Sequence, residues 1–267
     1  MNRTSMSNLF LLTASAAAAA AAAALSGCGT SQEAAEVPLS VVASARGMEA
    51  GVTDQGYTVT LRRARAALGD LEFTVGGEVH DTGALARLWD LVVPSAHAHP
   101  GHAAGGDVTG VLAGPFLVDW MADGAPLGTA LLLEGDYEGA NFAFRRAGAE
   151  DGLAAGDPLL GHTFAVEGTA SRDGQVIEID AIIDIEDGAL MVGAPFLLAV
   201  EPNTRSTLAL ELFPTDPVKG ASVWSGVDFA ALDTDGDGAV SIRPGEDAHN
   251  VLRRNLQIHD HYNIDIR

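Results

Sequence analysis

Short runs with strand composition recur from residue 37 to residue 213, separated by glycine, aspartate and proline. Several of them alternate apolar and polar residues, the period of two that a half-buried strand requires. The clearest pair spans 162–171 and 176–185 and is joined at Asp173-Gly174, a dipeptide that supplies the positive φ of a tight hairpin. The remaining runs fall at 37–45, 57–64, 71–75, 116–121, 141–146, 196–200 and 207–213. About nine strands with few helical patterns predict an antiparallel β-sandwich.

The pattern changes after about residue 225. Three elements are expected there: a short helical turn at 227–232, an acidic glycine loop at 233–238, and a helix at 247–259 with Asp247 as its N-cap. We therefore expect a β-sandwich body over 37–217, with a C-terminal segment over 218–267 packed on it.

Charge and cysteine content limit the partners and the kinds of site. The 267 residues include 36 acidic and 15 basic side chains, for a net charge of −21, and a single cysteine. This charge argues against nucleic acid as a partner, because binding a polyanion requires a basic face that releases counterions. One cysteine excludes an internal disulfide and a zinc site with two or more thiolates. The ligands of a transition metal must therefore be mainly histidine, aspartate or glutamate.

The N-terminal end has the composition of a targeting segment. Residues 1–27 contain one charged side chain, Arg3, and a run of 17 residues from Leu9 to Leu25 that is almost entirely leucine and alanine. This run is short for a transmembrane helix, which needs about 20 apolar residues, and it suits a signal peptide.

Leu25-Ser26-Gly27-Cys28, at the end of this run, resembles the lipobox of bacterial lipoproteins. The resemblance implies cleavage before Cys28, whose thiol and new amino group are then acylated. Residues 1–27 would be the signal peptide and 28–36 the acylated N-terminus and tether. Gly29 is not the aspartate that often signals inner-membrane retention, so we expect an anchor in the outer-membrane lipid bilayer. The alternative is an ordinary signal peptide followed by a chance cysteine.

Three of the eight histidines, His97, His99 and His102, fall within six residues in a stretch of small residues and proline. Imidazole is a favoured ligand of zinc and copper. Two histidines separated by one residue also project to the same side of an extended backbone. The stretch therefore predicts a zinc or copper site, and the alternative is a solvated histidine-rich loop without metal.

A second pair of histidines separated by one residue, His259 and His261, lies near the C-terminus. Two such pairs favour one shared site, because four nitrogen or oxygen donors complete a tetrahedral zinc site or a tetragonal copper site. His80 is a further candidate ligand, or a residue that orients one. By contrast, His162 at a strand start and His249 in the first turn of a helix suit structural or surface roles.

The acidic loop matches the Asp-x-Asp-x-Asp-Gly start of an EF-hand-type calcium loop, in which alternate carboxylates reach a central hard cation. The candidate ligands are Asp233, Asp235, Asp237, the Ala239 carbonyl, Ser241 and, if the loop is longer than in an EF-hand, Glu246 or Asp247. Pro244 occupies the twelfth position, where an EF-hand has a bidentate glutamate. We expect a structural calcium site, and the alternative is an acidic turn whose aspartates are solvated.

Motifs for catalysis are absent from the sequence. The chain has no Gly-x-Ser-x-Gly elbow and no His-Glu-x-x-His, and its sole cysteine is assigned to lipid. We therefore expect a protein that is not an enzyme. A zinc hydrolase, in which the histidines hold a catalytic zinc beside a carboxylate base, is the enzymatic alternative.

Residues 131–144, LLLEGDYEGANFAF, resemble the Gly-Asp-Tyr segment of the MbnP-like family, periplasmic copper-binding β-sandwich lipoproteins of bacteria. The resemblance implies a metal-handling, non-enzymatic lipoprotein. No ligand is carried over, because those proteins commonly contain cysteine pairs that this chain lacks. The leading expectation is an outer-membrane lipoprotein that captures a transition metal and hands it on to an outer-membrane transporter. The alternative is a calcium-stabilised surface interaction module whose histidines are incidental.

Overall fold

The computed structural model describes residues 35–76 and 106–267. Five of the predicted site residues lie outside this range: Cys28, His80, His97, His99 and His102. The strands are β1 (Glu36–Ser44), β2 (Gly51–Val52), β3 (Thr58–Val75), β4 (Asp107–Leu112), β5 (Phe116–Asp119), β6 (Pro126–Leu133), β7 (Gly135–Phe144), β8 (Phe164–Arg172), β9 (Gln175–Ile183), β10 (Leu190–Val200), β11 (Thr207–Leu212), β12 (Ala239–Ile242) and β13 (Tyr262–Ile266). The helices are the 3₁₀ helix η1 (Ala149–Asp151), α2 (Phe229–Leu232), α3 (Asp247–Asn255) and the 3₁₀ helix η2 (His259–His261). None of the helices in the described ranges has the length and apolar character needed to cross a membrane.

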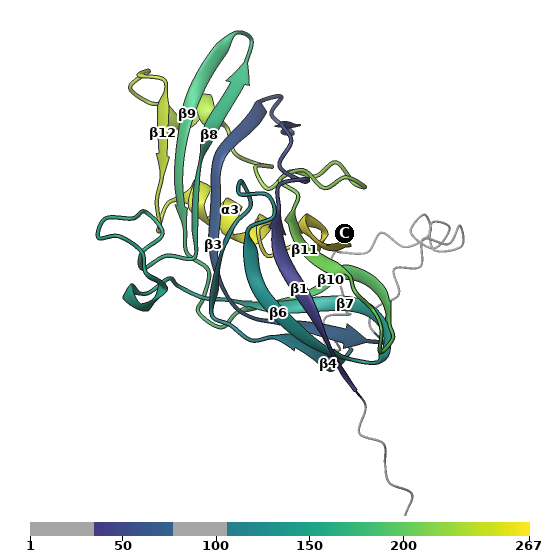
Figure 1. The fold of residues 1–267 in the computed structure, drawn as a ribbon. Helices are drawn as coiled ribbons and strands as arrows, with labels where there is room; N and C mark the ends of the chain where they lie inside the picture. The colour runs from purple at the N-terminus through teal and green to yellow at the C-terminus, as the bar shows by residue number, and fades with distance from the viewer. Residues whose placement is uncertain (1–34, 77–105) are drawn as a thin grey trace, which may run out of the picture. The chain divides into compact units, whose positions relative to one another are not determined.

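β3 organises the sheet because it changes partners along its length (Figure 1). Its first half, from Thr58 to Ala66, pairs with β8, and its second half, from Leu68 to Val75, pairs with β7. β2, β5 and β4 follow one another along the opposite edge. The main path runs β12-β9-β8-β3-β4-β6-β1-β11-β13, and β10 pairs with β7. Strands from both ends of the described chain therefore belong to one sheet.

The chain is mainly β, as the alternation of residues predicts, but the sheet is mixed and not purely antiparallel. β1 runs parallel to β11, with Ser40 opposite Thr207, and β12 runs parallel to β9. Alternation indicates which face a residue occupies and says nothing of strand direction. Parallel partners are also distant in sequence, so no tight hairpin reveals their orientation. The antiparallel part of the prediction is wrong for these two pairs.

The predicted hairpin is confirmed. β8 and β9 pair without a register shift, and the turn has φ of 53° at Asp173 and 80° at Gly174. By contrast, the strands predicted at 57–64 and 71–75 are one continuous strand. The residues between them stay extended because Ala66 and Leu68 are fully buried and have strand partners on both edges.

Both predicted C-terminal helices are present as α2 and α3. α3 begins one residue earlier than predicted, since Glu246 is its N-cap and Asp247 its first residue, and it ends at Asn255. Leu252 and Leu256 are buried, and Val251 is partly buried against the same core. β12 and β13 then pair with β9 and β11, so the C-terminal segment adds a strand to each end of the main path.

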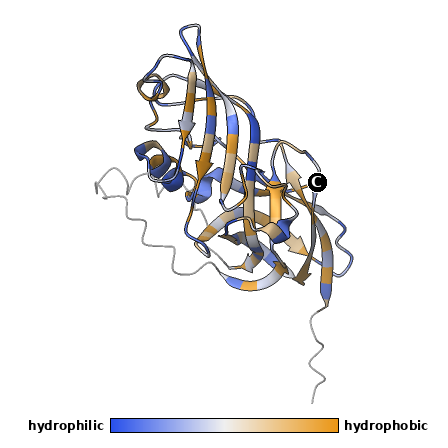
Figure 2. Ribbon diagram, turned by 90° about the vertical axis from the view of Figure 1, so that its left-hand side faces the viewer, coloured by the Kyte–Doolittle hydropathy of each residue, from blue (hydrophilic) through white to orange (hydrophobic). Residues whose placement is uncertain are grey.

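The buried residues form two clusters on opposite faces of β3, β8 and β9. The larger contains an aromatic group in which Trp120 stacks on Phe164 at 6.0 Å between ring centroids. The smaller consists of Ala67, Ala147, Leu159, Ala165 and Ile182. Its strand residues alternate with those of the larger cluster, so this part of the sheet is covered on both faces. Elsewhere the strands show hydrophobic and hydrophilic residues in alternation (Figure 2).

Candidate metal centre

The acidic loop lies between α2 and β12, and both of its ends are held by the sheet. The N-cap of α2, Asp228, accepts hydrogen bonds from the Ala231 N–H and from the Tyr57 hydroxyl on the β3 side, the latter at 2.9 Å. The Tyr57 ring also packs edge to face on Phe229, with centroids 5.2 Å apart. On the other side, β12 pairs residue by residue with β9. The loop is therefore fixed at two points that are distant in sequence.

Within the loop, three carboxylates converge. One oxygen each of Asp233, Asp235 and Asp237 lies within 4.8 Å of the others. Gly236 and Gly238 adopt φ of 69° and 78°, which side chains with a Cβ rarely take. These turns let the backbone fold the three carboxylates toward one point, as the Asp-x-Asp-x-Asp-Gly pattern predicts.

Each of the three carboxylates accepts a backbone hydrogen bond, and the bond to Asp235, from the Asp237 N–H at 3.5 Å, is the longest. The Gly238 N–H donates to Asp233 Oδ2 at 3.1 Å, and the Ala239 N–H donates to Asp237 Oδ1 at 2.8 Å. Asp233 Oδ1 is buried and has no hydrogen-bond partner among the described residues. Hard divalent cations such as calcium prefer carboxylate oxygens in this kind of flexible loop.

The negative charge of the loop is not balanced by any ion pair in residues 35–76 and 106–267. In the described part of the chain, no lysine or arginine forms an ion pair with Asp233, Asp235 or Asp237. Two unit charges about 4 Å apart repel by about 1 kcal/mol even in water. A bound cation would remove this repulsion.

The remaining predicted ligands lie on β12, which follows the loop, and in the turn after β12. Ala239 and Ser241 belong to β12 and are exposed. Glu246 accepts a hydrogen bond from the Arg243 N–H at 2.9 Å and is not part of the group of converging carboxylates. The structure thus brings together the three aspartates, while closure of the shell by Glu246 stays a prediction.

The C-terminal histidines are in a compact turn and not in an extended strand. His259 and His261 are the first and last residues of η2. His261 is 1% exposed, its Nδ1 lies 2.8 Å from the Phe213 carbonyl, and burial lowers the pKa of its imidazole. His259 Nδ1 lies 3.2 Å from an Asp260 carboxylate oxygen. Their predicted partners lie outside the described residues, so the shared zinc or copper site stays a prediction.

One group of polar residues was missed by sequence reasoning. His162 Nδ1 lies 2.8 Å from Asp184 Oδ1, and Arg146 forms an ion pair with the same carboxylate. His249 Nε2 in turn accepts a hydrogen bond from the Asp184 N–H at 3.0 Å. No short-range pattern could have revealed this group, because α3 and the end of β9 meet only in the folded chain.

Residues 131–144, which carry the resemblance to the MbnP-like family, form the end of β6, a tight turn and β7. Tyr137 of this segment donates from its hydroxyl to the Leu133 carbonyl at 2.9 Å, which closes the turn. No protein-family model, no curated protein and no solved structure matches the chain.

Proposed function

We propose that this chain is a membrane-anchored extracytoplasmic binding protein, not an enzyme, whose β-rich body is stabilised by calcium held in the acidic loop. The observation that supports calcium is the convergence of three carboxylate oxygens within 4.8 Å, without a compensating cation from the described protein. In this proposal, Asp233, Asp235 and Asp237 are the primary ligands, and water completes the coordination.

The expected strength of calcium binding follows from the ligand set. Calcium takes six to eight oxygens, and an EF-hand obtains two of them from a glutamate at a position that is Pro244 here. The Ala239 carbonyl and the Ser241 hydroxyl are the proposed additional donors. Such a site belongs with extracellular modules, whose dissociation constants are about 10⁻⁴ to 10⁻³ M. Calcium would then act on stability, since it joins the end of α2 to the start of β12.

The membrane anchor is the second part of the proposal. It rests on the lipobox-like sequence that ends at Cys28, and only seven residues lie between this cysteine and the first residue of β1. The proposed body is a β-sandwich. The change of strand partner along β3, from β8 to β7, supports an arrangement of the strands in two layers. Metabolic labelling with a palmitate analogue tests the anchor. Label is expected in the wild type and absent from Cys28→Ala.

The calcium site is tested by thermal unfolding and calorimetric titration of the mature chain. At a calcium concentration 100 times the dissociation constant, binding adds about 2.7 kcal/mol to the free energy of unfolding. The double variant Asp235→Asn/Asp237→Asn should lose this increase. The matched control, Glu134→Gln/Asp136→Asn, removes two exposed carboxylates from the β6–β7 turn and should keep it. An equal rise in melting temperature for both variants would refute a specific site.

A second candidate function is capture of zinc or copper and hand-over to an outer-membrane transporter. It is favoured by His97, His99 and His102 within six residues. His259, His261 and His80 are the proposed additional ligands. Affinity should collapse below about pH 6, because imidazole must be neutral to bind a metal. Titration with zinc and copper of a triple alanine variant at 97, 99 and 102 tests it, and unchanged affinity would refute it.

A further inference from the structure

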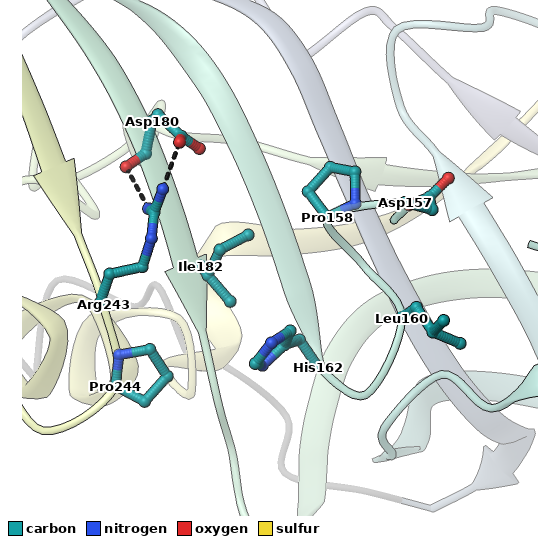
Figure 3. Close-up of a pocket in the computed structure, with 8 residues that line it drawn as sticks. All are labelled: Asp157, Pro158, Leu160, His162, Asp180, Ile182, Arg243 and Pro244. Carbon is teal, nitrogen blue, oxygen red and sulfur yellow. Dashed lines mark hydrogen bonds and ion pairs between the residues drawn. The ribbon is translucent and has the colours of Figure 1, made fainter. Parts of the chain in front are cut away.

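A pocket opens beside β12, away from the acidic loop (Figure 3). It encloses about 280 Å³ between the segment 157–162, the β9 residues Asp180 and Ile182, and the turn that follows β12. Apolar side chains from three different segments, Pro158, Ile182 and Pro244, form part of its walls. Sites for drug-sized ligands usually start at about 300 Å³, so this pocket suits a smaller molecule.

The charges around this pocket are balanced. Asp157 on its wall is paired with Arg65 at 3.0 Å, and Asp180 is paired with Arg243. Asp184, behind His162, is paired with Arg146 at 3.4 Å. In a chain of net charge −21, three aspartates and three arginines thus offset one another at one place. These carboxylates are already paired with arginines, so they would attract a cationic ligand only weakly. The paired arginines would likewise attract an anionic ligand only weakly.

His162 presents a hydrogen-bond acceptor to the pocket. A carboxylate only accepts, so the contact between His162 Nδ1 and Asp184 Oδ1 places a hydrogen on Nδ1. In the tautomer that carries its single hydrogen there, Nε2 is a hydrogen-bond acceptor. Among the described residues, Nε2 has no partner, and the side chain is 35% exposed. The ring is held in place because Asp184 is itself tied to His249 through its backbone N–H.

Arg243 supplies donors on the opposite side of the pocket (Figure 3). Its Nη atoms donate to the Asp180 side chain and to the Asp180 and Ile242 carbonyls. A guanidinium has five N–H groups, so N–H groups remain for a ligand. The pocket therefore offers fixed donors and fixed acceptors beside apolar walls.

We infer that this pocket binds a small neutral polyhydroxylated molecule of about monosaccharide size. Hydroxyl groups both donate and accept, so one such molecule can donate to His162 Nε2 and accept from Arg243. Its carbon skeleton would lie against Pro158, Ile182 and Pro244. The inference goes beyond the proposed function, because it requires neither calcium nor the lipid anchor.

Saturation-transfer NMR on the full mature chain tests the inference. The probes are D-glucose, D-mannose, N-acetyl-D-glucosamine and glycerol, with L-lysine and L-glutamate as charged comparators. At least one neutral probe should bind with a dissociation constant of roughly 1 mM, as expected for a small open site. His162→Phe and Arg243→Gln should each weaken this binding about tenfold, the effect of losing one well-placed hydrogen bond. The matched control is Arg62→Gln, which removes the exposed pair with Glu178 on β9 and should leave binding unchanged.

A measurement on the unaltered chain guards against variants that fail to fold. In backbone amide spectra, the bound probe should shift the signals of His162, Asp180 and Ile182 and leave those of Asp235 and Asp237 in place. Absence of binding by all four neutral probes would overturn the inference. Binding confined to lysine or glutamate, or shifts confined to the acidic loop, would overturn it as well.

Discussion

The acidic loop and the pocket lie at the two ends of β12, yet their carboxylates have opposite environments. In the loop, three aspartates converge within 4.8 Å and no described cation pairs with them. Around the pocket, three aspartates each have an arginine, with Asp157 and Arg65 3.0 Å apart. The same residue type therefore points to a cation at one end of the strand and to a neutral ligand at the other.

The largest expected loss of stability comes from removing an arginine from one of the ion pairs around the pocket. The side chains of Arg65 and Asp157 are only 17% and 16% exposed, so Arg65→Met leaves a largely buried carboxylate without its partner. We expect a loss of about 2–3 kcal/mol in the free energy of unfolding, somewhat less than the cost of breaking a fully buried pair, because both side chains are partly exposed. Urea unfolding measures it. Arg62→Met, which breaks an exposed pair on the same strand, is the control and should change little.

Removal of calcium from the acidic loop, at the other end of β12, should cause a comparable loss of stability. Chelation of calcium from a nearly saturated protein is expected to lower the free energy of unfolding by about 2 kcal/mol, the linkage term for a ligand at tens of times its dissociation constant. Amide hydrogen exchange locates the effect, since Val240 and Ile242 of β12 should lose protection before the β8–β9 hairpin does. Uniform loss across the sheet would contradict a local role for the loop.

Acid should lower the stability of the fold through two buried histidines, one of which, His249, is bonded to Asp184 behind the pocket. Burial lowers the pKa of His249 and of His261, which are 4% and 1% exposed. The unfolded chain therefore binds more protons than the folded chain below the ordinary histidine pKa of about 6.5, and stability should fall as the pH drops through that range. Urea unfolding at pH 7.5, 6.5 and 5.5 measures this slope. His249→Gln should reduce the dependence of the unfolding free energy on pH. An unchanged dependence would show that His249 is not responsible for it.

The smallest expected change in stability comes from relieving the repulsion among the aspartates of the calcium-free loop. Asp235 contributes only a long contact of 3.5 Å from the Asp237 N–H, so its carboxylate does little for the loop conformation. Without calcium, Asp235→Asn is expected to raise the free energy of unfolding by no more than about 0.5 kcal/mol. With calcium the sign should reverse, because the variant binds the ion less well. Differential scanning calorimetry in chelator and in calcium compares the two cases, and destabilisation in both would contradict unbalanced charge in the loop.

Elements that depend on neighbours in sequence were predictable. The hairpin at Asp173-Gly174, the helical turn before the loop, and α3 all follow from local turn and capping preferences. Even there, the helix begins one residue earlier than predicted: Glu246 occupies the N-cap position without a side-chain capping hydrogen bond, and its carboxylate accepts from the Arg243 N–H in the preceding turn. Pairings between distant segments were not predictable. Alternation could not show that β1 runs parallel to β11, or that two predicted strands form the single long β3.

By itself, the sequence determined the acidic loop, because aspartates at every second position and glycines with positive φ bring the carboxylates together within six residues. Only the tertiary structure decided which other charges are balanced. Arg65 and Asp157 are 92 residues apart in the chain, and Arg243 and Asp180 are 63 apart. The physical reason is that charge balance depends on distance in space, which sheet pairing sets for these residues and which short-range sequence does not encode.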